Sequence, residues 1–307
     1  MKTSVLKYTV FFVLMFINCA GQQKQQNIVR EPVVAGTFYP SNKTELQKQL
    51  ASFFDVVENK TTDENIRAII VPHAGYVFSG EVAASAFARL DPDKEYSRIF
   101  VIGSSHHIMM NGASIYNRGN YRTPLGIVEV DLELANKFLE NNKLFKFNPA
   151  AHDREHSIEV QLPFLQYQLK KNFKIVPIII STQNAATCKK IATELKPYFT
   201  GDNLFVISSD FSHYPNYANA VKTDKATGEA IASNSPSLFA GVINGNAEKN
   251  IPGLATSCCG WSSILTLLCI TSETPGIEIQ HVKYMNSGDT PYGDKQKVVG
   301  YHSFVIT

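Results

Sequence analysis

The stretch Arg67-Ala-Ile-Ile-Val-Pro-His-Ala-Gly-Tyr76 decides the fold class of this 307-residue chain. It contains a continuous apolar run ending at Val71, which is typical of a strand buried on both faces of a parallel sheet. A short polar loop with His73 follows, and residues 79–90 then show helical spacing with Ser79 in the N-cap position. A buried strand, a loop and a helix in this order predict an α/β domain.

The same succession recurs along the chain. We predict further strands at residues 98–102, 174–180, 204–208, 277–285 and 298–306. We predict further helices at residues 131–140, 158–169, 187–199, 217–232 and 260–270, the first of them opened by Asp131. No linker, repeat or low-complexity block interrupts the alternation. The predicted fold class is therefore α/β, a mostly parallel sheet flanked by helices, in a single domain over residues 31–307.

The composition excludes several classes of protein. With 44% hydrophobic and 18% charged residues, the chain is neither disordered nor fibrous. Its 29 Lys and Arg residues nearly balance 27 Asp and Glu residues, so we expect no nucleic-acid partner. Five cysteines in a chain of this length do not form a disulfide scaffold.

The amino terminus has the pattern of a secretory signal. Residues 1–18 place Lys2 and Lys7 before a short apolar segment, and Cys19 follows directly. This arrangement is similar to a bacterial lipobox, although Asn18 replaces the small residue usual before the cysteine. We expect a lipoprotein-type signal peptide cleaved before Cys19, lipidation of Cys19 and a flexible tether over residues 19–30. The protein would then be exported to the bacterial cell envelope and contact the membrane only through its lipid anchor.

Three histidines stand directly after predicted strands. His73 follows the first strand, His106 the strand at 98–102 and His213 the strand at 204–208. Ligands of open α/β sheets bind at the carboxyl ends of the strands, so these imidazoles are expected to converge on one crevice. Imidazole is both a frequent metal ligand and the usual acid or base near neutral pH.

A metal site with two histidine ligands needs a third. The candidates are Asp210, Glu159 and the vicinal pair Cys258–Cys259. The pair precedes an apolar helix, and a thiolate at a helix amino terminus has a lowered pKa. It is therefore a better source of a ligand than Cys188 or Cys269, which lie on apolar helical patterns.

Two other patterns in the sequence involve histidine. His152 and His156 are spaced i, i+4 as in zinc proteases, but Asp153 stands where that motif requires Glu. His156 and Glu159, spaced i, i+3, could instead form an imidazole–carboxylate pair beside a metal. The glycine-rich nucleotide motifs and the serine-hydrolase elbow are absent from the sequence.

Six motifs together resemble one known family. They are Ala35-Gly-Thr-Phe-Tyr-Pro40, Pro72-His-Ala-Gly-Tyr76, Gly103-Ser-Ser-His-His107, Tyr121-Arg-Thr-Pro-Leu125, Glu155-His-Ser-Ile-Glu159 and Ser208-Ser-Asp-Phe-Ser-His213. In this order they resemble the Memo family, named for a mediator of ErbB2-driven cell motility. Its bacterial members are known as protein B of the AmmeMemoRadiSam system. The resemblance covers about residues 30–307.

The resemblance implies a fold like that of the class III extradiol dioxygenases, with a metal site at the strand ends. It implies that His73, His106 and Cys259 are the metal ligands, with Cys259 assigned from its match to the family's Cys-Gly pair. It places Asp210 and His213 beside the metal, where the corresponding dioxygenase histidine is the acid–base catalyst. We expect His156, Glu159 and His107 to surround the ligands.

These residues leave three functions open. The first is a metal-dependent redox enzyme, related to the extradiol dioxygenases, acting on a small phenolic or other oxygen-bearing substrate. The second is a non-enzymatic copper- or iron-binding lipoprotein of the envelope. The third is a peptide- or partner-binding module that keeps the old active-site crevice. Two imidazoles and a thiolate suit one ion of copper or zinc, and imidazole still accepts iron.

Overall fold

The computed structural model describes residues 28–57 and 65–307. The predicted signal peptide, Cys19 and the tether as far as residue 27 therefore lie outside the described residues. Within those two ranges, no helix is long and apolar enough to cross a membrane.

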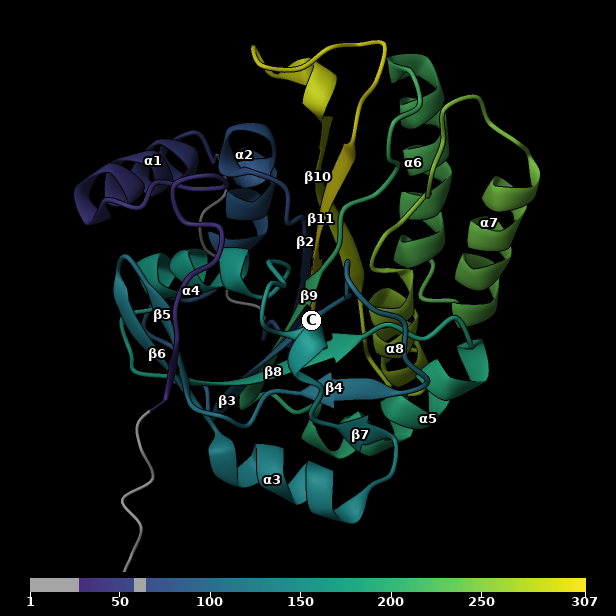
Figure 1. Ribbon diagram of the computed structural model, residues 1–307. Coiled ribbons are helices and arrows are strands. Elements are labelled where there is room, and N and C mark those ends of the chain that lie inside the picture. The colour runs from purple at the N-terminus through teal and green to yellow at the C-terminus, as the bar shows by residue number, and fades with distance from the viewer. Residues whose placement is uncertain (1–27, 58–64) are drawn as a thin grey trace, which may run out of the picture.

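The described chain is built around one mixed sheet of eleven strands (Figure 1). Its centre consists of five neighbouring parallel strands in the order β6–β8–β3–β9–β2. Their bounds are β6 (Gly126–Val130), β8 (Lys174–Ile180), β3 (Arg98–Gly103), β9 (Asn203–Ser208) and β2 (Ala68–Val71). This parallel centre agrees with the prediction from the buried apolar runs.

Antiparallel strands extend the sheet on both sides. β11 (Gly300–Ile306) pairs with β2, and β10 (Ile279–Asn286) pairs with β11. On the other side, β5 (Asn120–Thr123) joins β6, and β1 (Val29–Arg30) pairs with β5 in parallel. The short strands β4 (Ala113–Ile115) and β7 (Phe145–Lys146) branch from β8.

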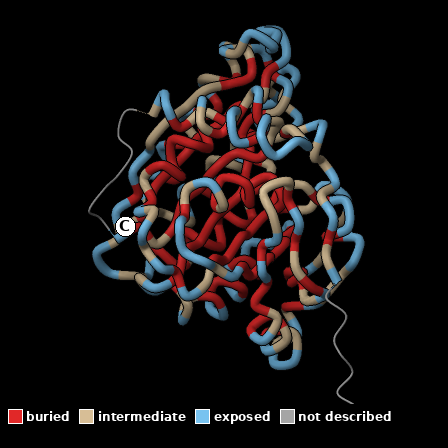
Figure 2. Tube along the Cα trace, turned by 90° about the vertical axis from the view of Figure 1, so that its left-hand side faces the viewer, coloured by how far each residue is buried: buried red, intermediate tan, exposed pale blue. Residues whose placement is uncertain are grey.

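Helices cover both faces of the sheet. They are α1 (Lys43–Asp55), α2 (Tyr76–Phe87), α3 (Leu132–Asn141), α4 (Leu162–Gln168), α5 (Ala185–Leu195), α6 (Tyr217–Ala232), α7 (Pro236–Glu248) and α8 (Trp261–Thr271). Short 3-10 helices span Pro149–Ala151, Glu159–Gln161, Lys196–Tyr198 and Ser287–Asp289. Along β3, Ile99 and Val101 pack with one core cluster, which includes residues of α1, α2 and α4. Phe100 and Ile102 pack with the other, which includes residues of α3, α5 and α8. The strands are consequently buried on both faces. Figure 2 shows buried residues, in red, through the interior of the molecule.

Most predicted elements appear close to their predicted bounds, and two helices begin differently. α2 begins at Tyr76 after Gly75, so the prediction that Ser79 is its N-cap was wrong; Ser79 lies inside the helix and its hydroxyl donates to Ala74 O, just before the helix, at 3.0 Å. The predicted helix 158–169 is a 3-10 turn followed by α4, which has Pro163 in its first turn. Asp131 does cap α3, because its carboxylate accepts from Leu134 N at 2.9 Å.

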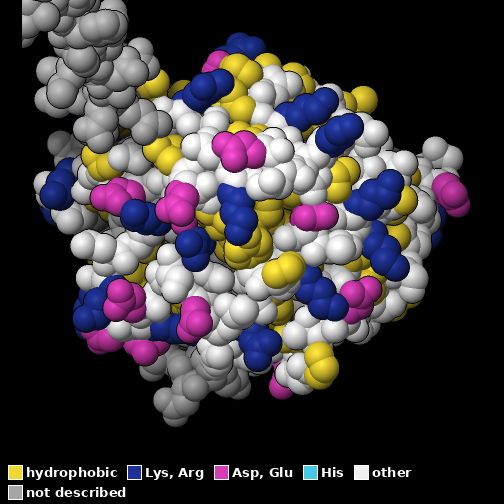
Figure 3. All heavy atoms as spheres, turned by 90° about the horizontal axis from the view of Figure 1, so that it is seen from below, with side chains coloured by type: hydrophobic (Ala, Val, Ile, Leu, Met, Phe, Trp, Pro, Cys, Tyr) yellow, Lys and Arg dark blue, Asp and Glu magenta, His cyan; other side chains and the backbone are white. Residues whose placement is uncertain are grey.

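The near balance of charge is visible on the surface. Figure 3 shows a face on which Lys and Arg side chains are interspersed with Asp and Glu. No broad area of one sign stands out among the described side chains on that face. The interspersed charges agree with the composition.

Candidate metal centre

Three neighbouring parallel strands bring polar loops together at the carboxyl ends of the strands. His73 lies two residues after β2, His106 three residues after β3, and Asp210 two residues after β9. β9 lies between the other two strands, and all three run in the same direction. Their carboxyl ends therefore meet, which is where ligands bind in folds of this kind.

Three imidazoles come together at these carboxyl ends. One ring nitrogen from each of His73, His106 and His156 lies within 4.8 Å of the others. The ring centroids are 5.1 Å apart for His73 and His106, 5.4 Å for His73 and His156, and 4.4 Å for His106 and His156. His213, which we predicted at the same crevice, lies outside this group of three, although its charge acts on His73 and Asp210; His156 joins the group instead.

The hydrogen bonds of His73 decide which of its nitrogens faces the cluster. Its Nδ1 lies 2.9 Å from Ser208 Oγ, and the Ser208 hydroxyl itself donates to Ser157 O at 2.6 Å. Ser208 must then accept from the Nδ1–H of His73, which leaves the lone pair on Nε2. Burial and the neighbouring His106 hold the pKa of His73 well below its usual range. His73 is therefore a neutral imidazole with a free donor atom, the form that binds metals.

Glu155 orients the second histidine. Its carboxylate lies 2.9 Å from His106 Nδ1 and also accepts from the His106 backbone N–H at 2.7 Å. Burial lowers the pKa of His106, but the hydrogen bond and charge of Glu155 outweigh it and the pKa is raised. The same carboxylate accepts from the backbone N–H groups of His156 and Ser157 at 3.0 and 2.9 Å. Glu155 thus leaves His106 Nε2 free and fixes the backbone beside His156.

From the sequence we expected the Glu159 carboxylate to pair with the imidazole of His156, but Glu159 has other partners. The Glu159 carboxylate binds Arg30 at 2.7 Å, Tyr39 Oη at 2.7 Å and the backbone N–H groups of residues 33 and 34. Glu155 was missed, although it stands directly before His156 in the same motif. The signal that could have found it is a carboxylate adjacent in sequence to a candidate ligand.

Of the two vicinal cysteines, Cys259 faces the histidines. Its Sγ lies 3.2 Å from His73 Nε2 and accepts from Asp210 N at 3.3 Å. Cys258 is 1% exposed, packs with the core and places its Sγ 3.2 Å from Ser209 Oγ. A Cβ on the next residue, Gly260, would collide with Ser209, so only glycine allows this close approach to the end of β9.

The pKa of the Cys259 thiol is not lowered as its position before α8 predicted. Burial and the neighbouring Asp210 raise its pKa well above the usual range. The thiol is consequently protonated at neutral pH and has to lose its proton before it can bind a metal. Cys188 and Cys269 lie on α5 and α8, as the apolar helical patterns predicted.

Asp210 and His213 come from the loop that follows β9. Asp210 accepts from His73 N at 2.7 Å, and its other oxygen lies 4.0 Å from His73 Nε2. Burial raises the pKa of Asp210, and the nearby His213 opposes this effect. His213 donates from Nδ1 to Phe211 O at 2.8 Å, because a carbonyl can only accept. Its Nε2 remains available for proton transfer.

The other two candidate histidines do not join the cluster. His107 is exposed and donates from Nε2 to Arg154 O at 3.1 Å, next to Glu155; its place around the ligands stays a prediction. His152 is buried beside Ser114 Oγ at 2.9 Å, and burial and Arg30 lower its pKa to about 3. His152 and His156 do not share a helix, which agrees with the rejection of a zinc-protease motif.

The donor set fits a transition-metal ion. Two nitrogens bound to one tetrahedral zinc ion at ~2.1 Å each lie about 3.4 Å apart. The three imidazole nitrogens, within 4.8 Å of one another, could bind one ion after side-chain shifts of about an ångström. The Cys259 Sγ is already 3.2 Å from His73 Nε2, within reach of a shared ion.

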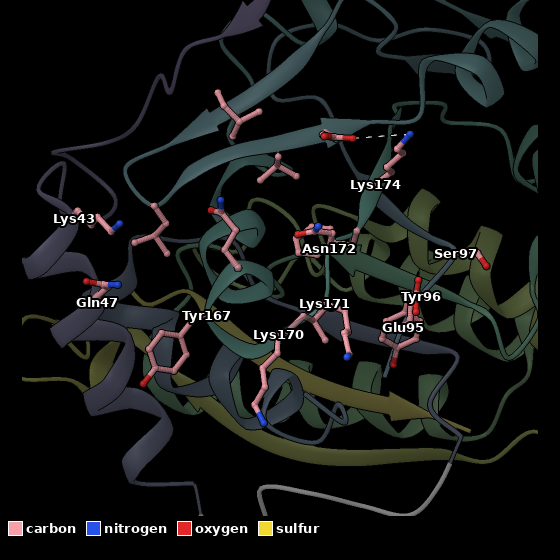
Figure 4. A pocket seen from close by; sticks show the side chains of 17 residues that line it. Lys43, Gln47, Glu95, Tyr96, Ser97, Tyr167, Lys170, Lys171, Asn172 and Lys174 are labelled. Atoms are coloured by element: carbon pink, nitrogen blue, oxygen red, sulfur yellow. Dashed lines mark ion pairs between the residues drawn. The ribbon is translucent and has the colours of Figure 1, made fainter. Parts of the chain in front are cut away.

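A separate cavity of about 830 Å³ lies at the other end of the strands, away from the histidines (Figure 4). Its lining includes Ser97, directly before β3, and Lys174, the first residue of β8. It therefore opens at the amino ends of strands, whereas His73 and His106 follow carboxyl ends. We place the candidate chemistry at the histidine cluster and not in this cavity.

Comparisons with known proteins agree with the sequence motifs. A family model described as "Memo-like protein" matches residues 30–305. The MEMO1 family protein of Sulfolobus acidocaldarius is 32% identical over 289 residues, covering 90% of this chain and 98% of the relative. That of Methanosarcina acetivorans is 33% identical over 282 residues, covering 91% and 99%.

A solved structure resembles the fold. The crystal structure of the uncharacterized protein JW3007 from Escherichia coli K12 matches with a TM-score of 0.51 and 13% identity. The match covers 78% of this chain and 99% of that one. At this level of identity the likeness shows the α/β fold alone.

Proposed function

This chain belongs to the Memo family, and from that premise we propose that it binds one transition-metal ion through His73, His106 and Cys259. The observation that carries the proposal is the 3.2 Å contact between Cys259 Sγ and His73 Nε2, beside the three clustered imidazoles. Two imidazoles and a thiolate favour copper or zinc, and they accept iron.

His156 is a fourth donor within reach. Burial and the neighbouring His73 and His106 lower its pKa to about 3, so the imidazole is neutral and able to bind. We propose that it lies beside the ion while Cys259 completes the ligand set, and that it becomes the third ligand when Cys259 is removed. Three imidazoles also make a recognised zinc site, without the preference of a thiolate for softer ions.

The residues beside the ligands support a catalytic role. A bound ion of this kind supplies a Lewis acid or a redox centre. Asp210, whose pKa is raised, can hold a proton near the centre, and His213 Nε2 can take a proton from a substrate hydroxyl or return it. We therefore propose a metal-dependent redox enzyme related to the extradiol dioxygenases, with a small phenolic compound as substrate.

A metal-binding protein without catalysis is the second candidate. The observation that favours it is the cysteine, because the dioxygenases have a carboxylate in that place and a thiolate holds soft ions tightly. Such a protein would hold copper or iron at the cell envelope. It would need the ligands but not the proton-handling pair Asp210 and His213.

Metal content measured by mass spectrometry after anaerobic purification tests the site. We expect about one ion per chain in the wild type and far less in His73→Ala, because His73 lies between Cys259 Sγ and the other two imidazoles and its loss separates the thiol from the cluster. Cys259→Ala should bind at least tenfold more weakly, and Cys259→Ala combined with His156→Ala should bind no metal. Cys258→Ala is the matched control and should keep full occupancy. Full occupancy in His73→Ala would contradict the proposal.

Turnover separates the two candidate functions. Oxygen consumption by the iron-loaded protein should be measured with a panel of catechols, in the wild type and in His213→Gln. An enzyme should consume oxygen in the wild type, and His213→Gln should retain its metal and lose the turnover. Full metal occupancy without turnover on any phenol of the panel would favour the metal-binding protein.

A further inference from the structure

Arg30, on β1, contacts residues 152–159, the segment that carries Glu155 and His156. Its Nε donates to His152 O at 3.0 Å, its Nη1 to Glu159 at 2.7 Å and its Nη2 to Glu155 O at 2.7 Å. The side chain is almost fully buried and stacks over the Tyr121 ring at 4.9 Å. One guanidinium therefore holds three points of the segment 152–159.

That segment contains two groups of the candidate centre. His156 is one of the three clustered imidazoles, and the Glu155 carboxylate sets the ring of His106. Segment 152–159 does not follow a parallel strand, and only the 3-10 helix at 149–151 and that at 159–161 adjoin it. Its position depends on contacts made from outside, and Arg30 makes three of them.

The acidic partner of Arg30 is also fully satisfied. Glu159 is 0% exposed and accepts from Tyr39 Oη and from the backbone N–H groups of Val33 and Val34 besides Arg30. A buried ion pair adds little stability beyond that of apolar residues of similar volume, because both charges lose their hydration. This ion pair instead fixes the orientation of the groups around it, because each donor of Arg30 points at a different acceptor.

We propose that Arg30 is a positioning residue for the metal centre. It fixes the backbone at residues 152 and 155, and this fixes the Glu155 carboxylate and the His156 ring. The inference rests on the proposed metal site and adds a residue that lies outside the ligands and the proton-handling pair. It predicts that the affinity for metal depends on the geometry of the Arg30 guanidinium. Arg30 lies 122 to 129 positions before its partners in segment 152–159.

The test compares two arginines in the full chain. Arg30→Lys keeps the charge and loses two of the three directed contacts, because an ammonium cannot reach acceptors in a planar fork. Arg98→Lys is the matched control, since Arg98 forms a 2.6 Å ion pair with Asp131 that does not touch segment 152–159. Glu159→Gln is a second, milder variant that keeps the shape of the carboxylate and removes its charge.

The readouts are the Kd for Zn²⁺, the visible absorption spectrum with Co²⁺ and the Tm of each variant. We expect Arg30→Lys to bind Zn²⁺ about ten- to hundredfold more weakly and to change the Co²⁺ spectrum, as removal of groups that orient ligands does elsewhere. Glu159→Gln should weaken Zn²⁺ binding in the same direction by a smaller factor. Arg98→Lys should lower the Tm and leave the Kd and the spectrum unchanged.

The outcomes are distinguishable. If the loss of His73 abolishes Zn²⁺ binding but Arg30→Lys binds Zn²⁺ as tightly as the wild type, the positioning role is overturned and the proposed function stands. A folded Glu159→Gln variant with unchanged affinity and an unchanged spectrum would also overturn it. A wild type that binds no Zn²⁺ or Co²⁺ would overturn the proposed function and this inference with it.

Discussion

Ser208, at the end of β9, has a larger part in the site than its neutral side chain suggests. It accepts from His73 Nδ1 and from Gln161 Nε2 at 2.9 Å each, and its single proton goes to Ser157 O. This pattern allows only one tautomer of neutral His73. The donor atom of the candidate centre is therefore selected by a serine that does not face the metal position.

Asp224 on α6 is a buried carboxyl whose affinity for protons depends on the fold. It accepts from Ser212 N at 2.9 Å, Ser212 Oγ at 2.8 Å and Tyr284 Oη at 3.0 Å. Burial raises its pKa to about 7, although these hydrogen bonds oppose the shift. The pKa of Asp in an unfolded chain is about 3.9, so the folded chain binds this proton more tightly. Asp224 should then lower the stability progressively as the pH rises from about 4 to about 7, by up to ~4 kcal/mol.

Asp224→Asn should remove this dependence. The asparagine keeps the shape, and the Ser212 and Tyr284 hydroxyls can turn to accept from its amide. We expect the free energy of unfolding in urea to fall less between pH 5 and pH 8 in Asp224→Asn than in the wild type. Asp202→Asn, at an exposed position, is the control and should follow the wild type. Equal slopes for the wild type and Asp224→Asn would contradict the assignment.

At the scale of elements, α1 and α2 pack unusually closely at Gly80. A Cβ at this position would collide with the ring of Phe53 on α1. Gly80→Ala should gain about 1 kcal/mol of helix propensity, but the collision should cost about 1–3 kcal/mol, so the variant should be less stable. In a Phe53→Ala background the same change should be neutral or stabilising. A double-mutant cycle by urea unfolding measures the coupling, and additive effects would show that the helices do not meet here.

The sequence predicted elements well where burial imposes a clear period. β8 and α6 have the predicted bounds, because an unbroken apolar run and a long helical spacing leave few alternatives. α1 was not predicted, although Asn42 caps it and Leu46, Leu50 and Phe54 recur at four-residue spacing. The strands β1 and β7 have two residues each, too few to show any period.

The candidate site was predictable mainly where it follows parallel strands, and Cys259 was found from its place before an apolar helix and from the family resemblance. His73, His106 and Asp210 could be placed from the strand ends alone. The place of His156 depends on the position of segment 152–159. Arg30 holds this segment through contacts between residues 122 to 129 positions apart in the sequence. Local patterns do not contain such a contact, and for this reason His156 was expected only around the ligands and not within the imidazole cluster.

At the scale of the whole molecule, the predicted anchor and the described domain can be tested together. If Cys19 is lipidated, the domain is exported and held at the membrane by acyl chains. We expect Cys19→Ala to partition into the aqueous phase of a detergent separation, while the wild type partitions into the detergent. Cys269→Ala, a cysteine on α8, is the control and should behave as the wild type. The absence of acyl mass at the wild-type amino terminus would contradict this prediction.

The position of β11 has a consequence for the order in which the molecule is made. This strand follows every other described strand along the sequence, yet it lies inside the sheet, between β2 and β10. Its first residue, Gly300, exchanges backbone hydrogen bonds with Phe211 and Ser212, in the loop that carries Asp210 and His213. A ribosome delivers residues 300–306 after every other strand described here, so this loop gains these partners only once β11 has emerged. The side of the candidate site that holds Asp210 and His213 is therefore completed by a strand made long after the loop itself.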